Sequence, residues 1–569
     1  MNRTVTRRDP LLRTETYTYD NNGNLATVLD RKSQTTTYTY DPLNRRTKTT
    51  FQDGTSTNYT YDAGNRITQV QEKNAGGTVT ATITRAYDGL DRLTQEVTAE
   101  GTVNYTYDNA SRRATMTVVG QTQVVYTYDN ANRLTQVQQG TSTVTIAYDD
   151  ADRRTSVTYP NTNKIEYIYN AASELTTVTY KQGTTTLGTL TYTYDAAGNR
   201  LKTGGTFARS NIPPVLTATN YNANNQQLTF GTTTETYDLN SNLATTTDAG
   251  VTTTYTWNAR NQLTGISKTG FTASFTYDSF GRRTNRTVNG TVINYVYDGL
   301  NPLQEKNGAT VTTNLLTGLG IDEFFTRTDG VGVRSLLPDA LGSTVALGDG
   351  TGTLQTQYTY EPFGFVSQTG ATSASSYKFT GREDDGTGLM YYRARYYQPR
   401  LLRFIAEDPI GFLGGDANLY GYVTENPLYY TDPSGECPWC VATLLGGLTN
   451  LGVQLIMNGG QIGCVDWSET LIAAAASGTG VGIAQNLGKV STVFGGPGRP
   501  TYRFFEIKGI VRVESHPISK SSPNVLSYLH VHADLLRDVL GKHHLPLVEP
   551  IVGGISVGLN ANKTCGCQR

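Results

Sequence analysis

Two short segments between residues 408 and 435 carry the side chains best suited to acid–base chemistry. They are Asp408-Pro-Ile-Gly411 and Asp432-Pro-Ser-Gly435. Two carboxyl groups held close together in a poorly solvated site cannot both ionise at low cost, so they share a proton and divide the roles of acid and base. A water molecule between them could attack a nearby peptide carbonyl. Asp408 and Asp432 are therefore candidate catalytic residues, and Arg403 is a candidate for positioning them or balancing their charge.

A simpler interpretation of these segments stays open. Asp accepts hydrogen bonds from the backbone that follows it, and Pro fixes the first dihedral angle of a turn. Each segment could therefore serve only as a turn. Asp416 is a third carboxylate candidate in the same stretch.

The histidines form a second candidate site near the C-terminus. All five fall between His516 and His544. Imidazole is the usual general base at neutral pH and a common metal ligand. We take His530, His532 and His543 as candidate catalytic residues of a nuclease-like hydrolase, with structural histidines or metal storage as alternatives. The sequence predicts short strands over 502–508 and 510–513 and a helix around 527–540.

All five cysteines also lie in this last part of the chain. Cys437 and Cys440 form one close pair, and Cys565 and Cys567 form another. Four thiols at the two ends of a domain could clip it with a zinc ion or with disulfides. We favour this structural clip over an oxidoreductase, because the Cys-x-x-Cys lacks a βαβ context. Zn is thus a possible cofactor.

The elements that must position these residues are set by a repeat. A Tyr-x-Tyr-Asp step, a few Asn or Gly residues and then Arg-Leu-Thr or a similar triplet recur fourteen times. The Asp or Asn stands at 20, 41, 62, 88, 108, 129, 149, 170, 195, 222, 238, 258, 278 and 298. A fixed period indicates one supersecondary unit stacked many times.

Each unit is predicted to be a β-hairpin. Polar and bulky residues alternate before the Asp, which is typical of a strand, and Asp and Asn supply the turn. Fourteen hairpins give roughly 28 strands in one antiparallel ribbon. Since open sheets twist and expose their edges, the ribbon should curl into a hollow shell or barrel about 40 Å across.

Composition supports a thin-walled β protein. Only 37% of the 569 residues are hydrophobic, and Tyr supplies 37 aromatic side chains. The net charge of −1 gives the shell no electrostatic reason to bind nucleic acid. The first residues show no apolar signal region and already belong to the repeats, so we expect a fragment of a longer protein or a dedicated export system.

After the repeats come denser motifs. These are Phe379-Thr-Gly-Arg, Tyr391-Tyr-Arg-Ala-Arg-Tyr-Tyr397, Arg403-Phe-Ile-Ala-Glu-Asp408-Pro and Asn418-Leu-Tyr-Gly-Tyr. With them the chain resembles the Rhs/YD-repeat proteins and their repeat-associated core domain, over about residues 10–435. The resemblance implies a β-shell closed by the core, a C-terminal segment, often a toxin, enclosed within it, and in many members an aspartyl autoprotease that cuts just past the second Asp-Pro-x-Gly.

Three positions depart from the family pattern. Gln398 stands where an Asp is usual, Leu402 replaces a Gly, and Glu436 replaces an apolar residue after the second Asp-Pro-x-Gly. These changes leave the fold expectation intact and bear on self-cleavage at Gly435/Glu436.

We therefore expect a mainly β protein with a small α+β C-terminal domain. The expected domains are a repeat shell at 1–305, a core that plugs the shell at 306–435, and an effector at 436–569. Buried helices are the first interpretation of the apolar stretches within 441–487, and membrane insertion is the second. Expected partners are an immunity protein and secretion or upstream shell components, with a secreted or cell-surface location. The rival hypothesis is a non-enzymatic surface protein that binds carbohydrate or cell surfaces.

Overall fold

The computed structural model confirms a mainly β protein. It describes residues 3–213, 215–216, 218–436, 502–507, 511–517, 527–533 and 545–546. Within these ranges the helical elements are three 3₁₀ turns, η1 (Phe379–Gly381), η2 (Gly411–Gly414) and η3 (Val423–Glu425). Every strand pair is antiparallel, apart from one isolated parallel bridge between Ser210 and Tyr360.

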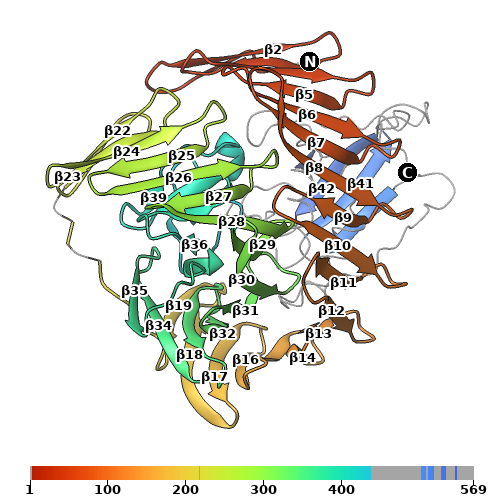
Figure 1. The fold of residues 1–569 in the computed structure, drawn as a ribbon, viewed down its shortest axis with the longest axis vertical. Coiled ribbons are helices and arrows are strands. Elements are labelled where there is room, and N and C mark those ends of the chain that lie inside the picture. Colours follow the sequence, from red (N-terminus) through yellow and green to blue (C-terminus); the bar gives the residue numbers. More distant parts are fainter. Residues whose placement is uncertain are drawn as a thin grey trace. The chain divides into compact units, whose positions relative to one another are not determined.

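The first sheet has 19 strands, each paired with its neighbour in the chain (red to orange in Figure 1). Its strands are β1 (Thr6–Arg8), β2 (Thr14–Tyr19), β3 (Leu25–Leu29), β4 (Thr35–Tyr40), β5 (Arg46–Thr50), β6 (Ser56–Tyr61), β7 (Ile67–Lys73), β8 (Val79–Tyr87), β9 (Leu93–Val97), β10 (Thr102–Tyr107), β11 (Arg113–Val118), β12 (Val124–Tyr128), β13 (Leu134–Gln139), β14 (Ser142–Tyr148), β15 (Arg154–Thr158), β16 (Asn163–Tyr169), β17 (Leu175–Gln182), β18 (Thr185–Tyr194) and β19 (Arg200–Gly204).

The second sheet has 16 strands in the same consecutive order. Its strands are β20 (Thr219–Tyr221), β21 (Gln227–Phe230), β22 (Thr233–Tyr237), β23 (Leu243–Asp248), β24 (Val251–Trp257), β25 (Leu263–Lys268), β26 (Phe271–Tyr277), β27 (Arg283–Val288), β28 (Thr291–Asp298), β29 (Asn301–Asn307), β30 (Thr310–Thr317), β31 (Phe324–Asp329), β32 (Gly332–Pro338), β33 (Thr344–Gly348), β34 (Leu354–Tyr360) and β35 (Val366–Gly370). A small sheet follows, of β36 (Glu383–Asp384), β37 (Met390–Tyr392), β38 (Arg395–Gln398) and β39 (Arg403–Phe404).

Two features differ from one continuous closed ribbon. Among the described residues no pairing joins β19 to β20, and none returns from the last strand of a sheet to its first. The break falls at 205–218, where Pro213 and Pro214 lack the N–H that a sheet ladder needs. The expected domain boundary at 305/306 lies inside β29, because the hairpin pattern runs on to Gly370.

The two sheets pack against each other through one apolar cluster. Val137, Ile165 and Val178 of the first sheet are buried in one apolar cluster with Leu337 and Ala346 of the second. Apolar contact of this kind stabilises a fold by about 25 cal/mol per Å² removed from water. The wall at this point is therefore a two-layer sandwich rather than a single layer facing solvent.

The repeat is explained by one turn used many times. At Asp129 the carboxylate Oδ1 accepts the backbone N–H of Ala131 and Arg133, both at 2.9 Å, and Oδ2 accepts Arg133 Nε at 2.7 Å. Asn132 between them has φ of 65°, which Asn tolerates better than most residues. The same five-residue turn recurs at Asp41, Asp88 and Asp278.

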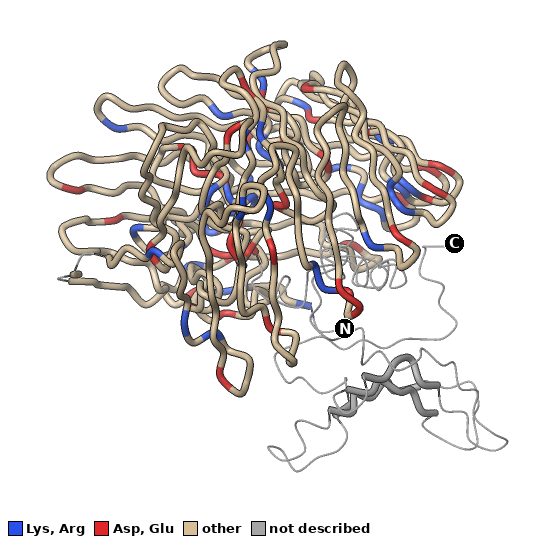
Figure 2. Tube along the Cα trace, turned by 90° about the horizontal axis from the view of Figure 1, so that it is seen from below, with Lys and Arg blue, Asp and Glu red and all other residues tan. Residues whose placement is uncertain are grey.

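The Arg and Tyr of each repeat join it to its neighbour. Arg133 donates to the backbone carbonyl of Asp149 at 3.0 Å, and its guanidinium lies 5.0 Å from the centre of the Tyr148 ring. The Tyr148 hydroxyl in turn donates to the carbonyl of Leu134 at 2.9 Å. Turn, cation–π contact and hydrogen bond thus connect successive hairpins. Figure 2 accordingly shows basic and acidic residues interspersed along the chain.

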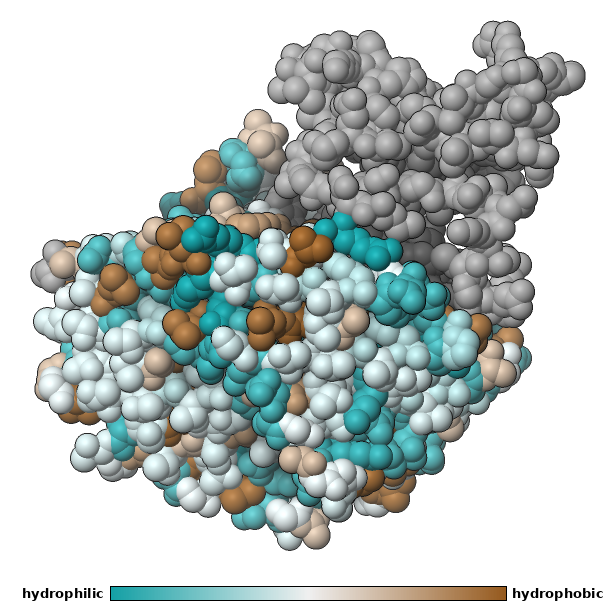
Figure 3. All heavy atoms as spheres, turned by 90° about the horizontal axis from the view of Figure 1, so that it is seen from above, coloured by the Kyte–Doolittle hydropathy of each residue, from teal (hydrophilic) through white to brown (hydrophobic). Residues whose placement is uncertain are grey.

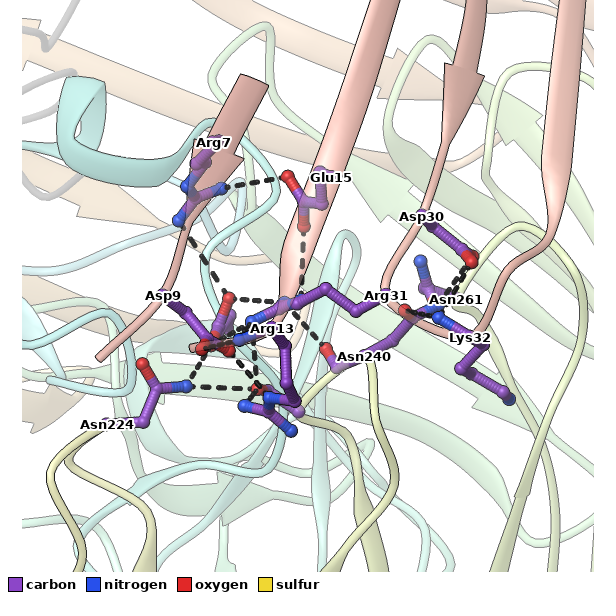
Figure 4. A network of polar contacts seen from close by, with 12 residues as sticks. Arg7, Asp9, Arg13, Glu15, Asp30, Arg31, Lys32, Asn224, Asn240 and Asn261 are labelled. Atoms are coloured by element: carbon purple, nitrogen blue, oxygen red, sulfur yellow. Dashed lines mark hydrogen bonds and ion pairs between the residues drawn. The ribbon is translucent and has the colours of Figure 1, made fainter. Parts of the chain in front are cut away.

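A buried ionic network joins the first strands to the second sheet and to the segment before Asp408 (Figure 4). Its centre is Arg31, whose side chain is 6% exposed and which contacts Asp9 and Glu15 at 3.1 Å and Glu407 at 2.7 Å. Arg31 also donates to the carbonyl of Asn240 at 3.0 Å. Burial raises the pKa of Glu407, but the hydrogen bonds and charge of Arg31 outweigh it and keep that pKa below its usual value.

The surface visible in Figure 3 is mostly pale or teal, with apolar residues scattered in small groups. Within the described ranges we find no helix long and apolar enough to cross a membrane.

The C-terminal part forms a separate unit that contains four described strands. They are β40 (Tyr502–Ile507), β41 (Val511–Pro517), β42 (Ser527–Ala533) and β43 (Leu545–Pro546), paired in chain order. The two expected strands are present. The expected helix around 527–540 is wrong over its first half, where β42 lies. The β-branched and aromatic residues in Ser-Tyr-Leu-His-Val-His-Ala favour a strand once partners flank it on both sides.

Candidate active site

Both Asp-Pro-x-Gly segments form turns, as their residues predict. The N–H of Ile410 donates to Asp408 Oδ1 at 3.0 Å, and the N–H of Gly435 donates to Asp432 Oδ1 at 2.9 Å. Gly435 has φ of 73°, in the left-handed region that suits glycine. Both segments are therefore turns, which does not exclude chemistry, because each carboxylate keeps a second oxygen.

The structure brings those second oxygens to one guanidinium, that of Arg395. Its Nη2 lies 3.0 Å from Asp408 Oδ2 and 3.4 Å from Asp432 Oδ2. The three side chains are 3%, 7% and 0% exposed for Arg395, Asp408 and Asp432 respectively. The arginine lies at the start of β38, and its guanidinium packs 3.6 Å from the centre of the Phe404 ring. Two carboxylates 24 positions apart in sequence thus share one buried cation.

Burial sets the protonation of this group. Burial, with a smaller contribution from the Asp432 charge, raises the pKa of Asp408 to about 6, while Arg395 and the Ile410 N–H oppose the rise. Burial also lowers the pKa of Arg395 from its ordinary value. A carboxyl group with such a pKa can give up a proton near neutral pH.

Arg403 does not take the position expected for it. It donates to the carbonyl of Asn225 at 2.6 Å and packs over the rings of Tyr221 and Tyr420. Its contacts in the described part of the chain include neither aspartate. Asp416 lines the same small pocket as Asp408, but its Oδ1 accepts the backbone N–H of Asn418 at 2.8 Å.

Glu436 completes the site. A Cβ atom on Gly414 would lie 2.7 Å from Asp408 Oδ2 and 2.8 Å from the Glu436 carbonyl oxygen, so both atoms lie against this glycine. The Glu436 side chain is itself desolvated, and burial together with Asp408 and Asp432 raises its pKa to about 7. Arg395 and Gly414 are not among the residues predicted from the sequence, and Glu436 appears there only as a departure from the family pattern.

Leu402, the second departure, has φ of 60°. The left-handed conformation costs an L-residue with a Cβ about 1–2 kcal/mol. Leu402 therefore adopts the left-handed backbone conformation that favours glycine, although it carries a side chain.

The arrangement offers two carboxyl groups for acid–base chemistry. One carboxylate can accept a proton from water and the other can donate a proton to a leaving amine, as in other paired-carboxyl sites. The Glu436 carbonyl oxygen lies against Gly414, as does Asp408 Oδ2, and the Glu436 N–H donates to Asp432 Oδ1 at 3.2 Å. Cys437, the next residue, lies outside the described residues.

The remaining candidates cannot all be placed. Cys437, Cys440, Cys565, Cys567 and His543 lie outside the described residues, as does the stretch 441–487. Over the described ranges no group of His, Cys, Asp and Glu could hold a metal ion. In the strand ladder His530 pairs with Glu514, and His532 pairs with Arg512. The catalytic role of these histidines stays a prediction.

Comparisons with known proteins agree with this architecture. The Teneurin YD-shell family model matches residues 155–428, and the RHS Repeat model matches residues 19–51. The crystal structure of TcdB2-TccC3 aligns with a TM-score of 0.54 at 18% identity, over 76% of this chain and 28% of that one. At that identity the likeness shows the fold alone.

Curated relatives match over shorter stretches. The toxin subunit YenC1 of Yersinia entomophaga is 38% identical over 19% of this chain and 11% of that protein. The tRNA(Glu)-specific nuclease WapA of Bacillus subtilis subsp. natto is 31% identical over 27% and 7%. The probable deoxyribonuclease RhsA of Dickeya dadantii is 46% identical over 10% and 4%. This chain thus spans only a small part of the relatives it matches.

Sheets, turns and matches together define a YD-shell protein. The chain belongs to the Rhs/YD-repeat family, and it is related to toxins and nucleases.

Proposed function

We propose that this chain is the carrier of a toxin, and that it cuts itself between Glu436 and Cys437 to free a C-terminal effector. The observation that carries the proposal is the pair Asp408 and Asp432 on one buried guanidinium, with Asp408 Oδ2 and the Glu436 carbonyl oxygen both lying against Gly414. Asp432 accepts the proton of a water molecule whose oxygen adds to that carbonyl. Asp408 donates its proton to the leaving nitrogen of Cys437. The products are a carboxyl group on Glu436 and a free amine on Cys437.

The effector is proposed to be a nuclease-like hydrolase enclosed by the shell. Its support is the naming of two relatives as nucleases and the cluster of histidines after residue 515. Under this proposal the protein is secreted or displayed at the cell surface, and an immunity protein guards the producing cell.

Intact-mass analysis of the purified full chain tests the cleavage. We expect two fragments that meet at Glu436/Cys437, and one uncut species from Asp408→Asn. Asp416→Asn is the matched control, because Asp416 lines the same pocket but binds the backbone of Asn418. It should cleave like the unmodified chain. An unmodified chain that stays whole contradicts self-cleavage, and cleavage that persists in Asp408→Asn contradicts the assigned mechanism.

Growth of a bacterial host tests the effector. Production of residues 437–569 should arrest growth, and the His530→Ala and His532→Ala variants should relieve the arrest. Normal growth with the unmodified segment would favour the rival surface-binding role.

A further inference from the structure

Residues 393–395, which lead into β38, donate hydrogen bonds to three successive backbone carbonyl groups of the segment 433–436, which we call the cleavage segment. Arg393 Nη1 donates to the carbonyl of Pro433, the N–H of Ala394 donates to that of Ser434 at 3.1 Å, and Arg395 Nε donates to that of Gly435. We call residues 393–395 the gripping loop. It fixes the backbone that leads directly to the Glu436 carbonyl.

Within the gripping loop, Arg393 differs from Arg395 in what anchors it. Its Nη2 binds Asp322 Oδ1 at 2.7 Å, and its Nη1 binds Asp322 Oδ2 at 3.1 Å. Nη2 also donates to the carbonyl of Leu300 at 3.2 Å. The Arg393 side chain is 9% exposed, so little solvent screens these contacts.

The anchors belong to the second sheet. Leu300 lies in the turn between β28 and β29, and Asp322 lies between β30 and β31. Asp322 is itself fixed by Arg382 Nη1 at 2.5 Å. Arg393 also has φ of 61°, in the left-handed region, which costs a residue with a Cβ about 1–2 kcal/mol. Arg393 therefore connects the β28–β29 turn and the β30–β31 connection with the backbone of residues 433–436.

We propose that Arg393 is a positioning residue that makes self-cleavage depend on the folded second sheet. The inference rests on the proposed function above. Until β28 to β31 have formed, Arg393 lacks Asp322 and Leu300, and the Pro433 carbonyl is not held in place. Displacement of a reacting group by about 1 Å can slow a reaction about 100-fold. Cleavage is therefore slow until strands β28 to β31 have formed. A cargo is then freed only after the sheet around the site is built.

Pulse–chase translation of the full chain measures the effect as a first-order rate of fragment formation. We expect Arg393→Lys to slow cleavage about 10- to 100-fold, because it keeps the charge but loses the bidentate contact with the Asp322 carboxylate. Asp322→Asn should slow it by a similar factor. The double variant should be no slower than the slower single variant, since both act through one chain of contacts. The pH profile should keep its shape, because Arg395 and the carboxylates are untouched.

Asp329→Asn is the matched control, because Asp329 ends β31 and its carboxylate binds Arg327 and the N–H of Val331 instead of the gripping loop. It should cleave at nearly the unmodified rate. A rate for Arg393→Lys within twofold of the unmodified chain overturns the inference, as does equal slowing by Asp329→Asn or a displaced pH profile. An unmodified chain that never cleaves refutes the proposed function itself. Limited proteolysis of each variant checks that it folds, and Asp322→Asn supplies the test if Arg393→Lys does not.

Discussion

Arg31 offers the sharpest test of how the shell is stabilised. Replacing it with Met removes a cation that contacts three carboxylates, Asp9, Glu15 and Glu407, in a network drawn in Figure 4. The exposed fractions of these side chains are between 5% and 14%. Removing one partner of a buried ion pair typically costs about 3–5 kcal/mol, since the other charge stays buried. We expect a loss of that size in the free energy of unfolding at pH 7.

The matched control is Arg133→Met, in the turn of the repeat that begins at Asp129. Arg133 is 23% exposed, and its partners Asp129 and Asp152 are 25% and 55% exposed. A pair in this setting contributes about 0.2–1 kcal/mol, and the cation–π contact with Tyr148 about 0.5–1 kcal/mol. The two substitutions remove the same charge and volume, so their difference measures burial.

The assay is urea unfolding of each variant on the uncleaved Asp408→Asn chain, repeated at several pH values. The pKa values of Asp9 and Glu407 are lowered in the folded protein, so their contribution is complete above about pH 5 and is lost as pH falls through the folded pKa values. The deficit of Arg31→Met should shrink in the same range. A loss no larger than that of Arg133→Met, or a deficit independent of pH, would refute the reasoning.

Three further outcomes follow from the structure. Tyr148→Phe should cost about 1–2 kcal/mol in urea unfolding, because the carbonyl of Leu134 loses its donor. Gly435→Ala should abolish cleavage in intact-mass analysis, because its Cβ would meet the carbonyl oxygen of Tyr392 and its φ is positive. Glu436→Gln should stabilise the Asp408→Asn chain by about 1–2 kcal/mol at pH 8 and little at pH 4. Burial, the largest cause of the raised pKa of Glu436, is kept in the Asp408→Asn chain, so the folded state loses stability as the pH rises from about 4 towards the folded pKa.

The period of the sequence was sufficient to predict the strands. Alternation before each Asp and turn residues after it place β2 to β28 within the expected array up to Asp298. The period did not reveal why Tyr and Arg recur, because their contacts join one repeat to the next. The hydroxyl of Tyr128 reaches the carbonyl of Arg113, 15 positions earlier, and only the register of the hairpins brings these atoms together.

The candidate site was predictable in its carboxylates and not in its cation. Asp408 and Asp432 belong to motifs that sequence displays, whereas Arg395 is one of several arginines in the same dense stretch. Arg403 is the arginine nearest to Asp408 before it in the chain. The hairpin of β38 and β39 places Arg403 beside Gln398, and its side chain lies against Asn225 and Asn418, while Arg395 at the start of β38 faces both aspartates. Proximity along the chain is a poor guide once a hairpin reverses it.

Asp298 also shows that position in the sequence does not predict contacts, here within the repeats themselves. By position it is the fourteenth member of the Asp series, yet its carboxylate does not close the five-residue turn. Its Oδ1 accepts the hydroxyl of Tyr105 at 3.0 Å, and its Oδ2 pairs with Arg113, both from the first sheet. Burial and the Asp298 charge raise the pKa of Tyr105, so this hydroxyl stays a donor at neutral pH. The residue that would have closed one more hairpin turn instead joins two sheets, because β29 begins after only two residues and leaves its carboxylate free to reach across.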